Sequence, residues 1–174
     1  MLFRSGYVLA AEELMEQAEE MGLAFDYVVC PSGTGGTQAG LILGLEQAHC
    51  PASVIGISVA QVYETQMKNV AGALEGTASL LGTEIPAPDK IICNADYLGE
   101  GYSRPTPELK EAVELLARTE GIMVDPVYSG KALAGLIGLV RNGMIKKGSK
   151  VVFFHTGGLT TYYDYSPMLG TPNL

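Results

Sequence analysis

The run of glycine and hydroxyl residues at positions 30–40, CPSGTGGTQAG, constrains this chain more than any other stretch. It follows an apolar, strand-like segment at residues 27–29 and leads into a helix-like segment at residues 39–46. Glycines let backbone N–H groups approach an anion, hydroxyls donate further hydrogen bonds, and a helix N-terminus supplies positive potential. A glycine-rich turn without a ligand is the alternative, but so many glycines carry a large entropic cost. The pattern therefore predicts a phosphate-binding loop made of Ser32, Gly33, Thr34, Gly35, Gly36 and Thr37.

Two common phosphate-binding motifs do not fit this run. The dinucleotide fingerprint G-x-G-x-x-G, counted from Gly33, requires a glycine where Gln38 stands. The P-loop requires a lysine near its end, and the sequence has no lysine between Val29 and Ile42. A compact loop with hydroxyls on both sides of a glycine pair suits one terminal phosphate better than a pyrophosphate.

Composition excludes several classes of protein. The chain has 174 residues, 47% of them hydrophobic and 17% charged, which is typical of one globular domain. Its net charge of −8 and lack of a basic stripe argue against nucleic acid as a partner. Three cysteines without metal-ligand spacing indicate a reducing compartment and no metal site. With no membrane-length apolar run and no signal-peptide pattern, we expect a cytoplasmic protein.

Strand-like and helix-like segments alternate along the chain. This alternation predicts an α/β fold with three layers, in which helices cover both faces of a mostly parallel, twisted sheet. Thr106 is expected to cap a helix that has Pro107 at its first position and stops at Gly121. The other expected helices cover residues 7–21, 39–49, 61–81 and 130–141, and the expected strands cover residues 27–30, 53–59, 90–93, 122–124 and 151–154.

Ligands of such sheets bind beyond the carboxyl ends of the strands, where two further loops carry reactive side chains. In the loop at residues 125–131, Tyr128 either faces the shared crevice or packs on the helix that follows. Ser129 in the same loop can be an ordinary helix cap, and Lys131 is expected to be solvated. In the loop at residues 155–160, Thr156 is expected to point into the crevice, and His155 is expected to be structural.

Three motifs together resemble one family: PSGTGGTQAG, RTEGIMVDPVYSGKALAGL and VVFFHTGG. They resemble the pyridoxal-phosphate enzymes of the D-cysteine desulfhydrase and 1-aminocyclopropane-1-carboxylate deaminase family, from about Gly6 to about Gly158. This family has the tryptophan synthase β-like fold, also called fold type II. The resemblance implies that residues 32–37 bind the 5′-phosphate of pyridoxal 5′-phosphate and that Tyr128, the catalytic candidate, lies beside the ring and the substrate. It also implies that Thr156 is the neutral hydroxyl partner of the pyridine nitrogen, with Ser129 nearby.

The resemblance also suggests a substrate class. A neutral partner does not hold a proton on the ring nitrogen, and this favours loss of a β-substituent over transamination. The deaminases carry glutamate after the tyrosine, whereas desulfhydrase-like members carry a small hydroxyl residue such as Ser129. We therefore expect β-elimination from a thiol amino acid, with D-cysteine giving pyruvate, sulfide and ammonia. The alternatives are L-cysteate, 1-aminocyclopropane-1-carboxylate, or a non-catalytic protein that binds a phosphate ligand.

One expected residue has no counterpart in this sequence. In the family, the lysine that forms the Schiff base lies in the N-terminal half, before the glycine loop. All lysines of this chain follow the loop, beginning with Lys68. We therefore expect residues 1–174 to be the C-terminal part of the enzyme's large domain and to be inactive alone. Unpaired sheet edges would favour a homodimer or association with the missing half.

Overall fold

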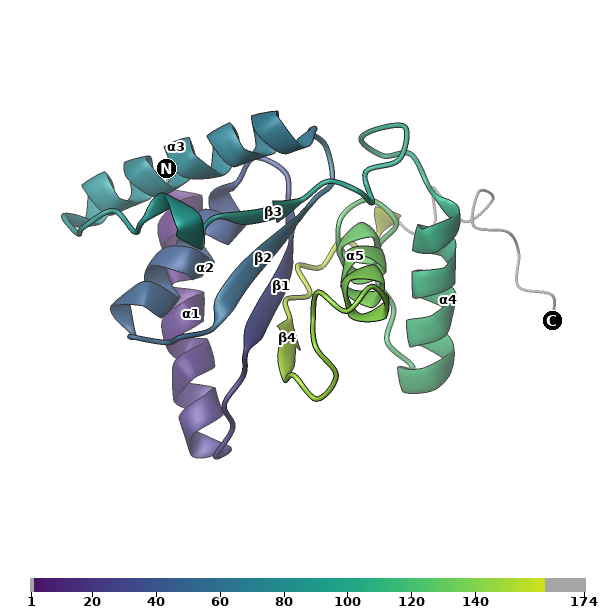
Figure 1. The fold of residues 1–174 in the computed structure, drawn as a ribbon, viewed down its shortest axis with the longest axis horizontal. Helices are drawn as coiled ribbons and strands as arrows, with labels where there is room; N and C mark the ends of the chain where they lie inside the picture. Colours follow the sequence, from purple (N-terminus) through teal and green to yellow (C-terminus); the bar gives the residue numbers. More distant parts are fainter. Residues whose placement is uncertain (1, 162–174) are drawn as a thin grey trace.

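The computed structural model describes residues 2–161, in which helices and parallel strands alternate (Figure 1). This order confirms the α/β class expected from the sequence. The helices are α1 (Leu2–Glu20), α2 (Gly36–Gln47), α3 (Tyr63–Leu81), the short 3-10 helix η1 (Pro88–Lys90), α4 (Pro107–Glu120) and α5 (Ser129–Arg141). The strands are β1 (Tyr27–Ser32), β2 (Ser53–Ser58), β3 (Ile92–Asn94) and β4 (Val151–Phe153).

The sheet has the order β3-β2-β1-β4 within the described residues, and every pair of neighbours is parallel. The chain steps outward from β1 to β2 and β3, then returns to place β4 on the other side of β1. The connection from β1 to β2 and the connection from β3 to β4 therefore run in opposite directions along the sheet. In open parallel sheets, a ligand crevice forms at such a reversal, outside the carboxyl ends of the strands.

Helices cover both faces of the sheet, as the sequence predicts. Side chains of a strand alternate between its faces, so Val28 and Cys30 of β1 pack with α1, α2 and α3. Val29 points to the opposite face and packs in the cluster of α5. Figure 1 shows α1–α3 on one side of the strands and α5 and α4 on the other.

The ends of α4 follow the local signals in the sequence. The Thr106 hydroxyl accepts a hydrogen bond from the backbone N–H of Leu109 (3.2 Å), and Pro107 occupies the first turn. Gly121 ends the helix with φ at 68°, a left-handed conformation that glycine adopts without strain. Both predicted boundaries of this helix are confirmed.

The strand expected at residues 122–124 is not formed. The Met123 carbonyl accepts a hydrogen bond from the ring Nε2 of His155 (2.8 Å) instead of joining a strand ladder. Two residues after Met123, Asp125 caps the start of α5, so residues 121–128 connect α4 to α5 as coil and a turn. No helix among the described residues has the length and apolar character needed to cross a membrane.

Candidate functional site: a cavity at the carboxyl edge of the sheet

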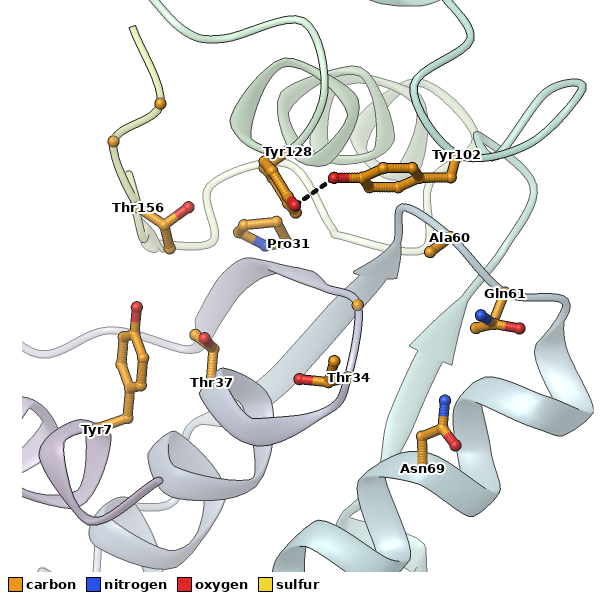
Figure 2. Close-up of a pocket in the computed structure, with 13 residues that line it drawn as sticks. Tyr7, Pro31, Thr34, Thr37, Ala60, Gln61, Asn69, Tyr102, Tyr128 and Thr156 are labelled. Carbon is orange, nitrogen blue, oxygen red and sulfur yellow. Dashed lines mark hydrogen bonds between the residues drawn. The ribbon is translucent and has the colours of Figure 1, made fainter. Parts of the chain in front are cut away.

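A cavity of about 760 Å³ lies at the carboxyl edge of the sheet, between the loops that follow β1 and β4 (Figure 2). Figure 2 shows Thr34 and Thr37 on one wall and Tyr128 and Tyr102 on the facing wall, with Thr156 at one end and Gln61 and Asn69 at the other. The cavity therefore brings together the three loops that the sequence analysis singled out. The lining residues are Tyr7, Pro31, Gly33, Thr34, Thr37, Ala60, Gln61, Asn69, Tyr102, Tyr128, Thr156, Gly157 and Gly158.

The glycine loop forms the N-terminal end of α2. Gly35 is the N-cap with φ at 83°, and a Cβ added there would lie 2.9 Å from the backbone of Val70. Glycine is thus required both by conformation and by close packing on α3. The N–H groups of the first turn, which begins at Gly36 and Thr37, have no acceptor within the helix. These donors and the two threonines at the cavity fit a phosphate group.

Ser32 lies apart from the other residues expected to hold the phosphate. Its side chain is buried, donates to Gln38 Oε1 (2.8 Å) and accepts from Gln66 Nε2 (2.8 Å). Ser32 is not among the residues that line the cavity. Its hydroxyl supports the loop from beneath, and its proposed contact with phosphate stays a prediction.

Beneath the loop lies a group of buried polar side chains, Ser32, Gln38, Ser58 and Gln66, which we call the buried amide network. Gln38 Nε2 donates to the carbonyl of Ile92 on β3 (2.8 Å), and the Ser58 hydroxyl donates to the carbonyl of Gln61 (2.6 Å). The network therefore joins the last residues of β1 and β2 and the first residue of β3 to α2 and α3. Buried polar groups with all partners in place fix one arrangement of the elements that they connect.

The wall opposite the glycine loop carries two tyrosines. The hydroxyls of Tyr128 and Tyr102 are 2.5 Å apart, and their rings meet edge to face with centroids separated by 5.9 Å. The hydrogen bond to Tyr102, followed by burial and the nearby charge of Asp125, raises the pKa of Tyr128 to about 12. Tyr128 therefore keeps its proton at neutral pH, and its hydroxyl oxygen can accept a hydrogen bond from a group in the cavity.

Ser129, expected near the pyridine nitrogen, is buried behind this wall and absent from the cavity lining. Its hydroxyl donates to Asp125 Oδ1 (2.5 Å), and its backbone N–H donates to the same oxygen (2.7 Å). Asp125 Oδ2 accepts from the backbone N–H groups of Val127 (2.8 Å) and Tyr128 (2.7 Å). The buried carboxylate therefore fixes the start of α5, from which Tyr128 projects. Thr156, by contrast, lines the cavity beside Gly157 and Gly158.

The expectation of a solvated Lys131 is wrong. The side chain is fully buried, and its Nζ donates to the carbonyl oxygens of Leu98 (2.8 Å) and Gly101 (2.6 Å). Burial lowers the pKa of this ammonium group. Two main-chain carbonyls, which only the folded chain brings together, replace the water that would otherwise solvate it.

The sequence analysis missed several residues of the site. Tyr102, Gln61 and Asn69 line the cavity, and Asp125 orients Tyr128 from behind. Tyr102 and Asn69 come from segments without a motif. Asp125 had a local signal, because an aspartate shortly before an apolar helical stretch is typical of a helix cap.

Comparison with known proteins yields one family. The family model described as pyridoxal-phosphate dependent enzyme matches residues 1–157. The chain is 40% identical to a 1-aminocyclopropane-1-carboxylate deaminase of Rhizobium radiobacter, over 92% of this chain and 48% of the relative. It is also 40% identical to a D-cysteine desulfhydrase of Klebsiella pneumoniae, over 94% of this chain and 49% of the relative. The chain thus spans about half the length of these curated relatives.

Solved structures agree with this assignment. The crystal structure of a homologue of 1-aminocyclopropane-1-carboxylate deaminase superimposes with a TM-score of 0.86 at 34% identity, covering 95% of this chain and 49% of that one. A fungal L-serine ammonia-lyase from Rhizomucor miehei, at 18% identity and a TM-score of 0.60, shares the fold over 93% of this chain and 55% of its own. With the family model matched over nearly the whole described region, the chain belongs to the pyridoxal-phosphate dependent enzymes.

Proposed function

We propose that this chain is the phosphate-binding part of a pyridoxal-phosphate dependent lyase that eliminates the β-substituent of a thiol amino acid, with D-cysteine as the preferred substrate. The observation that carries the proposal is the cavity itself. One wall is a glycine loop at a helix N-terminus, and the others carry Tyr128 and Thr156, the residues that the family resemblance assigns to the cofactor ring.

The residues of the cavity have separable roles in this proposal. Gly33, Thr34 and Thr37, with the first N–H groups of α2, bind and orient the phosphate. Thr156 offers the ring nitrogen a neutral hydroxyl. Tyr128 holds a proton on its hydroxyl over the neutral range, so its neutral oxygen accepts a hydrogen bond from a donor group of the substrate. When bound, the cofactor supplies the electron-withdrawing ring that carbanion chemistry on an amino acid requires.

The identity of the residue after Tyr128 supports D-cysteine. The deaminases of this family carry glutamate there, and this chain carries Ser129, whose hydroxyl is bonded to Asp125. Deamination of 1-aminocyclopropane-1-carboxylate is the second candidate, because the deaminase and the desulfhydrase are equally similar to the chain. L-cysteate is a third possible substrate, and a non-catalytic phosphate-ligand protein is the alternative outside enzymes.

The half-length match supports the proposal that the chain alone is inactive. The lysine that links the cofactor lies, by family resemblance, in the other half. The partner we propose is that half of the enzyme, either in the same subunit or in a homodimer.

A binding experiment tests the cofactor site without any turnover. The purified chain is titrated with pyridoxal phosphate, and the dissociation constant is compared among the wild type, Thr34→Val and Thr37→Val. Loss of one hydroxyl bond to an anion costs about 1.5 kcal/mol, so each variant is expected to bind about tenfold more weakly. Thr83→Val is the matched control, because the Thr83 hydroxyl is buried without a hydrogen-bond partner in the described region. Equal affinities of all four proteins contradict the proposed phosphate site.

A complementation experiment tests the reaction. The chain is mixed with the separately produced N-terminal half of the Klebsiella desulfhydrase, and sulfide release from D-cysteine is measured. We expect turnover only in the mixture. Ammonia release from 1-aminocyclopropane-1-carboxylate without sulfide release from D-cysteine supports the second candidate. Robust turnover of D-cysteine by the chain alone contradicts its proposed inactivity.

A further inference from the structure

The loop between β3 and α4 carries Tyr102 to the cavity and has an irregular backbone. Gly99, Gly101 and Ser103 have φ angles of 65°, 134° and 62°, so three residues near the tyrosine lie outside the usual region. The Leu98 N–H bonds the Ala95 carbonyl at 3.2 Å and the Arg104 N–H bonds the Gly101 carbonyl at 3.3 Å, both long for main-chain bonds. A loop of this kind does not hold a side chain in one place by its own backbone.

Lys131 supplies the missing attachment. Its ammonium group bonds the carbonyl oxygens of Leu98 and Gly101, and Gly101 directly precedes Tyr102. The lysine side chain has no exposed surface, so its ammonium group depends on these two carbonyls and not on solvent. Removal of either bond would leave a buried cation without sufficient partners, which makes the attachment strong.

The same end of α5 also carries the partner of Tyr102. Tyr128 is the N-cap residue of this helix and Lys131 lies three positions later, so both project from its first turn. One contact joins hydroxyl to hydroxyl, and the other joins the lysine to the backbone beside the tyrosine. We infer that Lys131 is a positioning residue, which holds the loop of Tyr102 so that the Tyr102 hydroxyl meets that of Tyr128 at the cavity wall.

This role differs from simple support of the fold. A lysine that only filled space in the interior would change the free energy of unfolding when replaced, and it would leave the tyrosine pair unchanged in molecules that remain folded. A positioning lysine also changes the pair. The protonation of Tyr128 reports this difference, because its pKa is raised first by the hydrogen bond to Tyr102.

The test uses the full 174-residue chain with tyrosine labelled by ¹³C at Cζ, without cofactor. NMR spectra near pH 11 measure the ionised fraction of Tyr128, assigned with Tyr128→Phe. A pKa of about 12 leaves about a tenth of Tyr128 ionised in the wild type, and a return toward 10 ionises about nine tenths in Lys131→Met. Lys131 itself has a lowered pKa, but its neutral amine retains two donors for the two carbonyls.

Two variants bracket the result. Tyr102→Phe removes the phenol partner and gives the ionised fraction of a Tyr128 that lacks this hydrogen bond. Lys147→Met is the control, because that lysine is exposed in the segment after α5. A folded Lys131→Met protein whose Tyr128 ionises as in the wild type overturns the inference. If Lys131→Met does not fold, ¹⁵N NMR of the wild-type lysine side chains at neutral pH decides: a slowly exchanging Lys131 ammonium supports the attachment, and a rapidly exchanging one overturns it. Neither measurement involves pyridoxal phosphate, so failure here is separate from failure of the proposed function.

Discussion

Gly56, in the middle of β2, is the residue where a single methyl group should do most damage to the site. A Cβ added there would lie 1.9 Å from Oε1 of Gln38 and 2.3 Å from its Cδ. Gln38 is fully buried, so its side chain cannot swing out into solvent. The substitution Gly56→Ala therefore displaces the Gln38 amide from the buried amide network.

The cost follows from the bonds that are lost. The displaced amide no longer accepts from Ser32 (2.8 Å) or donates to the Ile92 carbonyl (2.8 Å). A buried polar group left without a partner costs about 1–3 kcal/mol, and overpacking of an interior costs about 1–3 kcal/mol. We expect Gly56→Ala to lower the free energy of unfolding by about 2–6 kcal/mol, the sum of these two costs. Because Ser32 supports the glycine loop, the affinity for pyridoxal phosphate should fall as well.

Urea unfolding followed by circular dichroism measures the change. Gly72→Ala is the matched control: Gly72 is exposed within α3 with no atom within 4 Å of an added Cβ, and alanine there should stabilise the helix by about 0.5–1 kcal/mol. A Gln38→Ala/Gly56→Ala double variant makes room for the methyl group, so its loss should be smaller than the sum of the two single losses. A Gly56→Ala protein within about 0.5 kcal/mol of the wild type would refute the reasoning, since this is the scatter of ordinary surface substitutions.

Three further changes probe other parts of the molecule. Gly35→Ala should destabilise the chain by about 1–3 kcal/mol more than Gly22→Ala in the same urea assay, because both glycines have positive φ but an added Cβ meets backbone only at Gly35. Burial raises the pKa of the Cys30 thiol to about 12, so iodoacetamide at pH 8 should modify Cys30 about 1,000-fold more slowly in the folded chain than in urea, as mass spectrometry can measure; equal rates would contradict its burial. The hydrogen bond from Arg141 lowers the pKa of Glu111, so its stabilising effect is present above the pKa of the unfolded carboxyl and is lost as the pH falls through that of the folded one. The stability difference between wild type and Glu111→Gln should therefore vanish in acid, and a difference that persists there would exclude this origin.

Local signals predicted the elements, and long-range contacts explain what was missed. The Thr106 cap and the Gly121 stop depend on neighbours within one helical turn, and both are confirmed. The segment 122–124 has the apolar residues of a strand, yet whether it pairs depends on the distant His155, which bonds its backbone instead. The alternation of segments was enough to predict the parallel sheet, but not the order in which its strands lie.

The candidate site shows the same division. The glycine loop and Tyr128 were found from their motifs, and the cavity brings them together. Tyr102 was missed because its loop has no pattern, and its place depends on the buried Lys131. Ser32 and Ser129 carry the residue types of ligands, but their hydroxyls donate to buried protein groups, that of Ser32 to Gln38 and that of Ser129 to Asp125. Residue type thus predicted chemistry, and only packing decided which groups face the cavity.

The position of β4 beside β1 has a consequence for the order of folding. The backbone N–H of Lys150, just before β4, bonds the carboxylate of Asp26, just before β1, and these residues are 124 positions apart in the sequence. By contrast, α2 is the only helix of the described chain between β1 and its other neighbour β2. Closing the longer loop costs more entropy, so we expect the β1–β2 pair and the glycine loop to form before β4 joins them. Pulse-labelled hydrogen exchange during refolding should then protect Val59, whose N–H bonds the Ser32 carbonyl, earlier than Phe154, whose N–H bonds the Val29 carbonyl. A ligand that touches both the glycine loop and Thr156 would act on the last step of folding, and would slow unfolding more than it speeds refolding.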